Sequence, residues 1–251
     1  MPLEVQAFAW GAIAGAALLI GAAIAWKWKV PPRTVSFVMA FGAGVLISAL
    51  AFELVAEAQE AGGLVPTGLG FLVGAVAYVG ANAVLARKGA QHRKRSGGQQ
   101  PRETEDAGSG NAIALGALLD GIPESVVLGL GLVASGTVNP AVLVAIFISN
   151  VPEGLSSSAG MRNAGRGPRY VFGLWGGIAL VSGLSALAGY SLLAGASGVT
   201  IAFITAIAAG AILAMVADTM IPEAFEKQHM LTGLIAALGF LTAFVVHEVS
   251  G

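Results

Sequence analysis

The sequence predicts an all-α polytopic membrane protein with eight transmembrane helices. Three observations point to this fold class: charged residues make up 11% of the 251 residues, hydrophobic residues make up 56%, and long apolar stretches recur along the chain. A soluble globular domain carries roughly 25% charged residues, so the shortage of charge indicates that lipid surrounds most of this chain. The 36 glycines agree with this interpretation, because small residues let helices approach closely in a bilayer.

A membrane-spanning helix needs about 20 predominantly apolar residues, and eight such stretches can be delimited. Pro31 and Pro32 separate the first two. The first stretch is predicted to be a span rather than a signal peptide. Lys27 and Lys29 follow it, whereas a signal peptide places its positive charge before the apolar core. The predicted spans are residues 7–26, 35–57, 65–86, 111–133, 140–161, 170–194, 200–222 and 230–249.

The distribution of Lys and Arg predicts the orientation. All 13 fall in the odd-numbered loops between spans, and the even-numbered loops have none. Cytoplasmic loops are enriched in Lys and Arg, so the odd loops are predicted to be cytoplasmic and both termini extracytoplasmic. This alternation needs an even number of spans and therefore supports eight. Richness in alanine and glycine without cysteine favours the inner membrane of a bacterium.

The chain is predicted to form a single transmembrane domain over residues 1–251, with a flexible cytoplasmic loop at residues 88–110. This loop is polar and of mixed charge, as disordered linkers are. We expect its histidine, His92, to be solvated, with metal collection as an alternative role. His229 and His247, at the two ends of the last span, are expected to lie at the membrane interface.

Acidic residues, unlike the cations, fall inside the predicted spans. A carboxylate at the bilayer centre costs a few kcal/mol on insertion scales and marks a functional site by default. No span contains Lys or Arg, so we expect these acids to be protonated, hydrated or bound to a cation. They are Glu53, Asp120, Glu124, Glu153 and Asp218, with Glu57 and Glu223 near helix ends.

Spacing places several of these groups on shared helix faces. Asp120 and Glu124 are four residues apart in span four, and Asn150 and Glu153 are three apart in span five. Residues at these separations are neighbours on a helix surface. We therefore expect Asp120, Glu124, Asn150 and Glu153 to form a midplane site between the two spans.

Both spans also carry a Pro-Glu pair. Proline removes one helical hydrogen bond, which would free the carbonyl groups of Leu119 and Ile148 near the acids. Carboxylate, amide and carbonyl oxygens are the ligands that hard divalent cations prefer. The paired motifs thus predict a divalent-cation site.

Spans two and seven share a sequence pattern. Glu57 follows Gly44 by 13 residues, and Glu223 follows Gly210 by 13 residues. The predicted topology runs the two spans in opposite directions across the membrane. An inverted repeat of this kind is typical of secondary transporters, with Glu57 at the outer mouth and Glu223 at the inner mouth.

These motifs resemble those of the ZIP (Zrt/Irt-like) family of divalent metal transporters. That family carries His-Asn-x-Pro-Glu-Gly on span four, a similar motif on span five and His-Glu-x-x-Pro-Glu on span seven. Here residues 120–125 read Asp-Gly-Ile-Pro-Glu-Ser, residues 149–154 read Ser-Asn-Val-Pro-Glu-Gly, and residues 218–223 read Asp-Thr-Met-Ile-Pro-Glu. The resemblance implies eight spans in a 3+2+3 bundle, and uptake of metal toward the cytoplasm.

The resemblance implies that Glu124, Glu153 and Asn150 are metal ligands, because they match the family's motifs. The histidines of these motifs are replaced by other residues in this chain. Thr219 stands where the family has a glutamate, which puts a second adjacent metal site in doubt. Zinc is the metal that the family implies, but carboxylates in place of imidazoles favour harder ions, so manganese, iron or cadmium are alternatives. With the acids along the path, the candidate metal ligands are Asp120, Glu124, Asn150, Glu153, Asp218, Ser149, Glu53 and Glu223.

Other functions remain as alternatives. A divalent cation channel and a transport-dead relative both fit the composition. An intramembrane hydrolase is less favoured, because no span offers Lys or Arg and no HExxH motif is present, and no enzyme activity is expected. A net charge of −1 gives no basic surface for nucleic acid. The expected partners are the lipid bilayer, the transported metal and, by resemblance, a second copy in a homodimer; no cofactor is expected.

Overall fold

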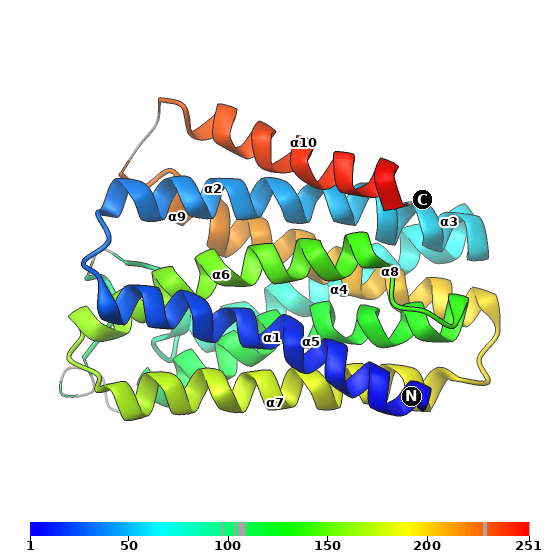
Figure 1. Cartoon of the computed structure of the whole chain (residues 1–251), viewed down its shortest axis with the longest axis horizontal. Coiled ribbons are helices and arrows are strands. Elements are labelled where there is room, and N and C mark those ends of the chain that lie inside the picture. Colours follow the sequence, from blue (N-terminus) through cyan, green and yellow to red (C-terminus); the bar gives the residue numbers. More distant parts are fainter. Residues whose placement is uncertain (97, 103, 105–108, 228–229, 251) are drawn as a thin grey trace.

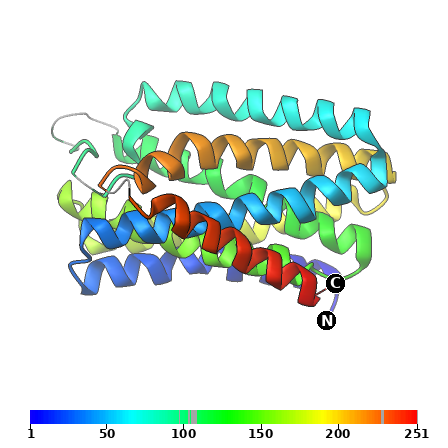
Figure 2. The same ribbon diagram turned by 90° about the horizontal axis from the view of Figure 1, so that it is seen from above.

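The computed structural model describes residues 1–96, 98–102, 104, 109–227 and 230–250. Within these ranges the chain is helical and has eight helical segments that are long and apolar enough to cross a membrane. Figures 1 and 2 show them side by side in one bundle, with both termini at the same end. The predicted fold class and number of spans are confirmed. The α-helices are α1 (Leu3–Lys27), α2 (Pro32–Ala49), α3 (Ala56–Gly62), α4 (Leu64–Ala86), α5 (Ser109–Ser135), α6 (Pro140–Asn163), α7 (Pro168–Leu193), α8 (Gly198–Met215), α9 (Ile221–Ala224) and α10 (Thr232–Ser250).

Spans two and seven each contain a π-helical segment near their end. Helix α2 passes through Leu50–Val55 into α3, and α8 passes through Val216–Met220 into α9. The two segments start six residues after Gly44 and Gly210, respectively. The two spans thus share a π-helical distortion of the backbone in addition to the same spacing between glycine and glutamate. Such π-helical turns are rare and frequent at functional sites.

The same two glycines sit at closely matched helix contacts. A Cβ atom on Gly44 would lie 1.9 Å from the carbonyl oxygen of Ala236 in α10, and one on Gly210 would lie 1.9 Å from that of Phe71 in α4. Span eight thus packs on span two as span three packs on span seven. In Figure 1, α2 runs toward the end that holds the termini and α8 runs away from it. These features agree with the inverted repeat expected from the sequence.

Helices α5 and α6 occupy the interior of the bundle. Most of the apolar window of α6 is buried, whereas α4 and α10 expose most of theirs and would face lipid. Both interior helices continue through their prolines, Pro123 and Pro152. The acids that precede or follow these prolines therefore project from unbroken helices into the centre of the molecule.

Candidate cation site

Three carboxylates lie buried where α5 and α6 face each other. Asp120 and Glu124 project from α5 and Glu153 from α6, with 2%, 1% and 4% of their surfaces exposed. The ammonium group of Lys94 lies 3.3 Å from Asp120 Oδ2 and 2.7 Å from Glu153 Oε2. A single positive charge thus links the acid of span four to the acid of span five.

The expectation that the buried acids have no cationic partner is wrong for Asp120 and Glu153. Besides Lys94, the guanidinium of Arg93 binds Asp120 through two parallel hydrogen bonds, Nε to Oδ2 at 2.9 Å and Nη2 to Oδ1 at 2.8 Å. Both cations belong to the loop after α4, where a short 3₁₀ turn at Ala90–His92 leads the chain back into the bundle. No Lys or Arg lies within a predicted span, and nothing in the sequence indicates that cations of a loop reach the site.

Helix α4 completes the environment of Arg93. The Tyr78 hydroxyl donates to Asp120 Oδ1 at 2.5 Å and accepts from Arg93 Nη2 at 2.8 Å. Asn82 Oδ1 accepts from Arg93 Nη1 at 2.8 Å. Burial alone would lower the pKa of Arg93, but the neighbouring Asp120 carboxylate raises it above its ordinary value. Sequence analysis did not single out Tyr78 and Asn82, although their separation of four residues places two polar groups on one face of an apolar helix.

Glu124 differs from the other two acids. Neither of its carboxyl oxygens has a hydrogen-bond partner among the residues that the structure describes. Its charged neighbours are Glu153, Lys94 and Asp120, and two of these three are acids. An isolated buried carboxylate is strongly unfavourable, so this group fits the expectation of an acid that is protonated, hydrated or bound to a cation.

The loop that supplies Arg93 and Lys94 is anchored at its next two residues. Arg95 donates to the carbonyl oxygen of Pro222 at 2.8 Å and pairs with Glu226 at 3.0 Å. Ser96 donates to Glu223 Oε1 through its backbone N–H at 3.1 Å and its hydroxyl at 2.5 Å. Glu223, expected to attract ions at the inner mouth, accepts hydrogen bonds that hold the loop in place.

Helix α6 holds the loop from the other side. The Ser156 hydroxyl donates to the Lys94 carbonyl oxygen at 2.6 Å. The Gln100 side-chain amide donates to the carbonyl oxygens of Arg93 at 2.8 Å and Ser157 at 3.1 Å. His92, expected to be solvated, is partly buried. Burial together with nearby Arg95 lowers its pKa, which favours the neutral imidazole. This part of the loop is a packed element of the site.

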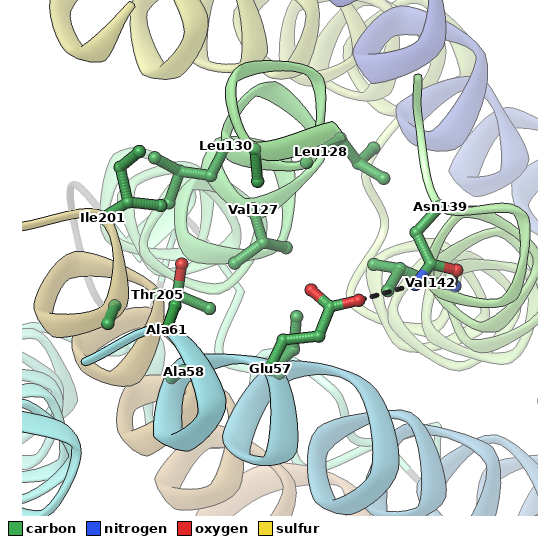
Figure 3. Close-up of a pocket in the computed structure, with 14 residues that line it drawn as sticks. Glu57, Ala58, Ala61, Val127, Leu128, Leu130, Asn139, Val142, Ile201 and Thr205 are labelled. Atoms are coloured by element: carbon green, nitrogen blue, oxygen red, sulfur yellow. Dashed lines mark hydrogen bonds between the residues drawn. The ribbon is translucent and has the colours of Figure 1, made fainter. Parts of the chain in front are cut away.

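A second polar cluster lies toward the end of the bundle that holds the termini. Asn139, at the start of α6, donates to Glu53 Oε2 at 2.6 Å and to Glu57 Oε1 at 3.0 Å. His247 Nδ1 lies 2.6 Å from Glu53 Oε1. Figure 3 shows Glu57 reaching from α3 toward Asn139 beside apolar residues of α5. Neither the role of Asn139 nor the contact of His247 with Glu53 was anticipated from the sequence.

Three candidate ligands have hydrogen-bond partners other than the buried acids. The Asn150 amide donates to the carbonyl oxygen of Ala14 in α1 at 2.9 Å. The Ser149 hydroxyl donates to the Ile146 carbonyl oxygen of its own helix at 2.9 Å. Asp218 is exposed on the π-helical segment of span seven and accepts from Asn82 at 3.2 Å. The contact of Asn150 with α1 was not anticipated, because helical spacing cannot say which neighbouring helix a shared face meets. His229 lies outside the described residues.

Two of the three carboxylates in this arrangement are held by protein cations. Within the described part of the chain, no three His, Asp or Glu side chains are grouped closely enough to hold a metal ion. The donor set of Asp120, Glu124 and Glu153 has the chemistry of a divalent-cation site, but two of the three are paired with Arg93 and Lys94. No protein-family model matches this chain, and no curated protein matches its sequence.

Proposed function

We propose that this chain is a secondary transporter of divalent metal cations, similar to the ZIP family, and that Asp120, Glu124 and Glu153 bind the cation in transit. One observation carries this proposal: three carboxylates are buried together at the centre of a membrane bundle, and both oxygens of Glu124 have no partner among the described residues. Intramembrane acids of this kind mark ion paths. A structural role alone gives no reason for a third, unpaired acid.

The architecture supports alternating access. Spans two and seven carry the same glycine contact, the same π-helical distortion and a glutamate at the same position, in opposite directions. Transporters with inverted repeats bind substrate between the repeats and expose the site alternately to the two sides. Uptake toward the cytoplasm, location in a bacterial inner membrane and extracytoplasmic termini belong to the proposal, on the strength of the resemblance and the loop charges.

A transport-dead relative is the second candidate, and one observation favours it. Arg93 and Lys94 already neutralise two of the three acids, as would be expected if a former cation site had become a structural ion-pair network. This alternative predicts that no divalent ion binds under any condition. The transporter proposal predicts that one does.

Uptake by the purified protein in liposomes tests the two candidates. We expect saturable uptake of at least one of Zn²⁺, Mn²⁺, Fe²⁺ and Cd²⁺, and its loss in Glu124→Ala and Glu153→Ala. Glu248→Ala removes an exposed acid of α10 and serves as the matched control, with uptake unchanged. Absence of uptake by well-folded wild-type protein and also by Gly160→Ala, in which a Cβ atom would clash with the loop after α4, would favour the transport-dead relative.

The ranking of ions tests the chemistry of the site. Oxygen ligands favour Mn²⁺ and other hard ions, whereas imidazole favours zinc and its neighbours. The two histidines that the structure describes have other acidic neighbours: His247 lies beside Glu53 and His92 near Glu226. We expect Mn²⁺ to compete with Zn²⁺ at comparable concentration. Strong preference for Zn²⁺ over both Mn²⁺ and Fe²⁺ would contradict a carboxylate site.

A further inference from the structure

We propose that Arg93 and Lys94 are tethered substitutes for the transported cation: they occupy its carboxylates, and the loop that bears them must withdraw before a divalent ion can bind. The proposal rests on the function proposed above and adds the regulation of that site. It identifies the described structure as a self-blocked state of the transporter.

The charges in the site support an exchange between loop and metal. Arg93 and Lys94 bring two positive charges to Asp120 and Glu153, each within hydrogen-bonding distance of at least one of them. A divalent cation carries the same total charge. Replacement of the two side chains by one ion would therefore leave the buried site with the same net charge. The exchange avoids the large free-energy penalty of leaving unpaired carboxylates in a low-dielectric interior.

The helices around the loop are shaped to receive it. A Cβ atom on Gly160 of α6 would lie 2.1 Å from the Arg95 carbonyl oxygen and 2.3 Å from Gln100 Nε2. A Cβ atom on Gly116 of α5 would lie 2.5 Å from Arg93 Cδ. Glycine at these two positions creates the space in which the loop backbone and the Arg93 side chain rest. An ordinary solvated linker would not require this space.

The contacts that hold the loop would allow it to withdraw from the site through a local change. The hydroxyl groups of Ser96 and Ser156 both lie within 3.0 Å of Glu223 Oε1, so the loop, span five and span seven meet at one carboxylate oxygen. Arg95 is 23% exposed and pairs with the partly exposed Glu226. Because these contacts lie between the buried site and the end of the bundle from which the loop arises, their release would open the site from that end without unfolding a span.

Equilibrium binding and uptake of Mn²⁺ and Zn²⁺ test the competition. Gly160→Ala keeps every charge and should expel the loop through the clash with Arg95 and Gln100. Lys94→Ala removes the tethered charge directly. Each should tighten apparent cation affinity by about tenfold or more, because a binding-competent state that is rarely populated weakens affinity in proportion. Lys88→Ala, an exposed cation of the same loop, and Gly176→Ala, a glycine with open space around it, should leave affinity unchanged.

A reversible cross-link tests the position of the loop itself. The chain has no cysteine, so Ser96→Cys with Ser156→Cys introduces a single pair, at two hydroxyls that each lie within 3.0 Å of Glu223 Oε1. Oxidation should form the disulfide, block uptake and lower cation binding, and a reductant should restore both. Each single-cysteine variant serves as the control and should not respond to oxidant.

The outcomes separate this inference from the proposed function. Two results would contradict the proposal that Arg93 and Lys94 substitute for the cation: failure of the disulfide to form, or equal cation binding by the oxidised protein, Gly160→Ala and wild type. Neither result would contradict the proposed transport function. Tighter binding in Gly160→Ala together with weak or absent uptake by the wild type supports both. No cation binding by wild type, Gly160→Ala or Lys94→Ala overturns both proposals, even where the disulfide forms.

Discussion

Asp120 shows at the scale of a residue how the site is held together. Its two oxygens accept hydrogen bonds from Tyr78 and Arg93 and lie beside Lys94, so groups from α4 and from the following loop converge on one side chain of α5. A buried ion pair is weak support for stability when compared with apolar packing, but removal of one partner is costly because the other charge is left behind. Single changes around Asp120 should therefore have measurable effects.

We expect Tyr78→Phe to destabilise the protein by about 1–3 kcal/mol, the range for leaving a buried polar group without its partner. The substitution removes the donor to Asp120 Oδ1 and the acceptor for Arg93 Nη2 while keeping the aromatic ring. Thermal unfolding of the purified protein in detergent measures the loss. Tyr190→Phe, on the partly buried face of α7, is the control, and an equal effect of both substitutions would show that the hydroxyl network contributes nothing.

Asn139 allows two roles of one side chain to be separated. Its Oδ1 accepts from the backbone N–H groups of Ala141 and Val142 and caps α6, while its Nδ2 joins Glu53 to Glu57. Serine is a good N-cap residue but is too short to join both acids; alanine does neither. Loss of a cap costs about 0.5–2 kcal/mol, so we expect Asn139→Ala to unfold at a lower temperature than Asn139→Ser. Equal unfolding temperatures would exclude a capping role.

The sequence identified the acids of the site but not their partners. The cost of burying a carboxylate in lipid is a property of each residue, so Asp120, Glu124 and Glu153 could be selected without knowledge of the fold. Pairing is a property of tertiary structure: Arg93 lies 27 residues from Asp120 along the chain, and no local pattern indicates that the loop turns inward. The contact of Asn150 with α1 could not be predicted for the same reason.

At the scale of the elements, the matched glycines of spans two and seven set how closely helices approach. A methyl group at Gly44 or Gly210 would meet a backbone carbonyl oxygen at 1.9 Å, and backbone cannot move aside as a flexible side chain can. The two contacts join α2 to α10 and α8 to α4. They fix the outer helices of the bundle on the two spans that carry the π-helical segments.

We therefore expect Gly44→Ala and Gly210→Ala each to destabilise the bundle by at least about 3 kcal/mol, the upper end of ordinary overpacking. Gly80→Ala in α4, where a Cβ atom would meet nothing within 4 Å, should be neutral. Size-exclusion chromatography and thermal unfolding in detergent report the effect. Monodisperse Gly44→Ala protein with the stability of the wild type would show that this approach is not required.

The ends of the membrane-spanning helices could be predicted from hydropathy, whereas the π-helical segments within them could not. The first predicted span, 7–26, lies inside α1, and the turn at Gly63, whose φ is +80°, follows the predicted end of span two. The π-helical segments have no distinct composition: Leu50–Val55 reads as ordinary apolar helix with one acid. A π turn is selected by what the widened helix contacts, such as Asn139 and His247 around Glu53, and such contacts form only in the assembled bundle.

The bundle as a whole has two polar regions at different depths. Toward the termini, the acids are bound by Asn139 and His247. Toward the opposite end, where the loop after α4 arises, the acids are bound by Arg93, Lys94 and Ser96. Glu124 remains the acid without a hydrogen-bond partner among these described groups. An ion that crosses the molecule would have to displace protein partners at both ends, as alternating access requires that the two ends open in turn.

The side on which each end lies can be measured directly, because the chain has no cysteine. Loops with Lys and Arg are expected on the cytoplasmic side, so single cysteines at the exposed positions Lys88 and Arg169 should react with a membrane-impermeant maleimide only after cells are permeabilised. A cysteine at exposed Thr137, in a loop without cations, should react in intact cells. The reverse pattern would place the loop of Arg93 and Lys94 outside, on the side from which a metal that is taken up would arrive. Reactivity of all three positions in intact cells would contradict the predicted topology altogether.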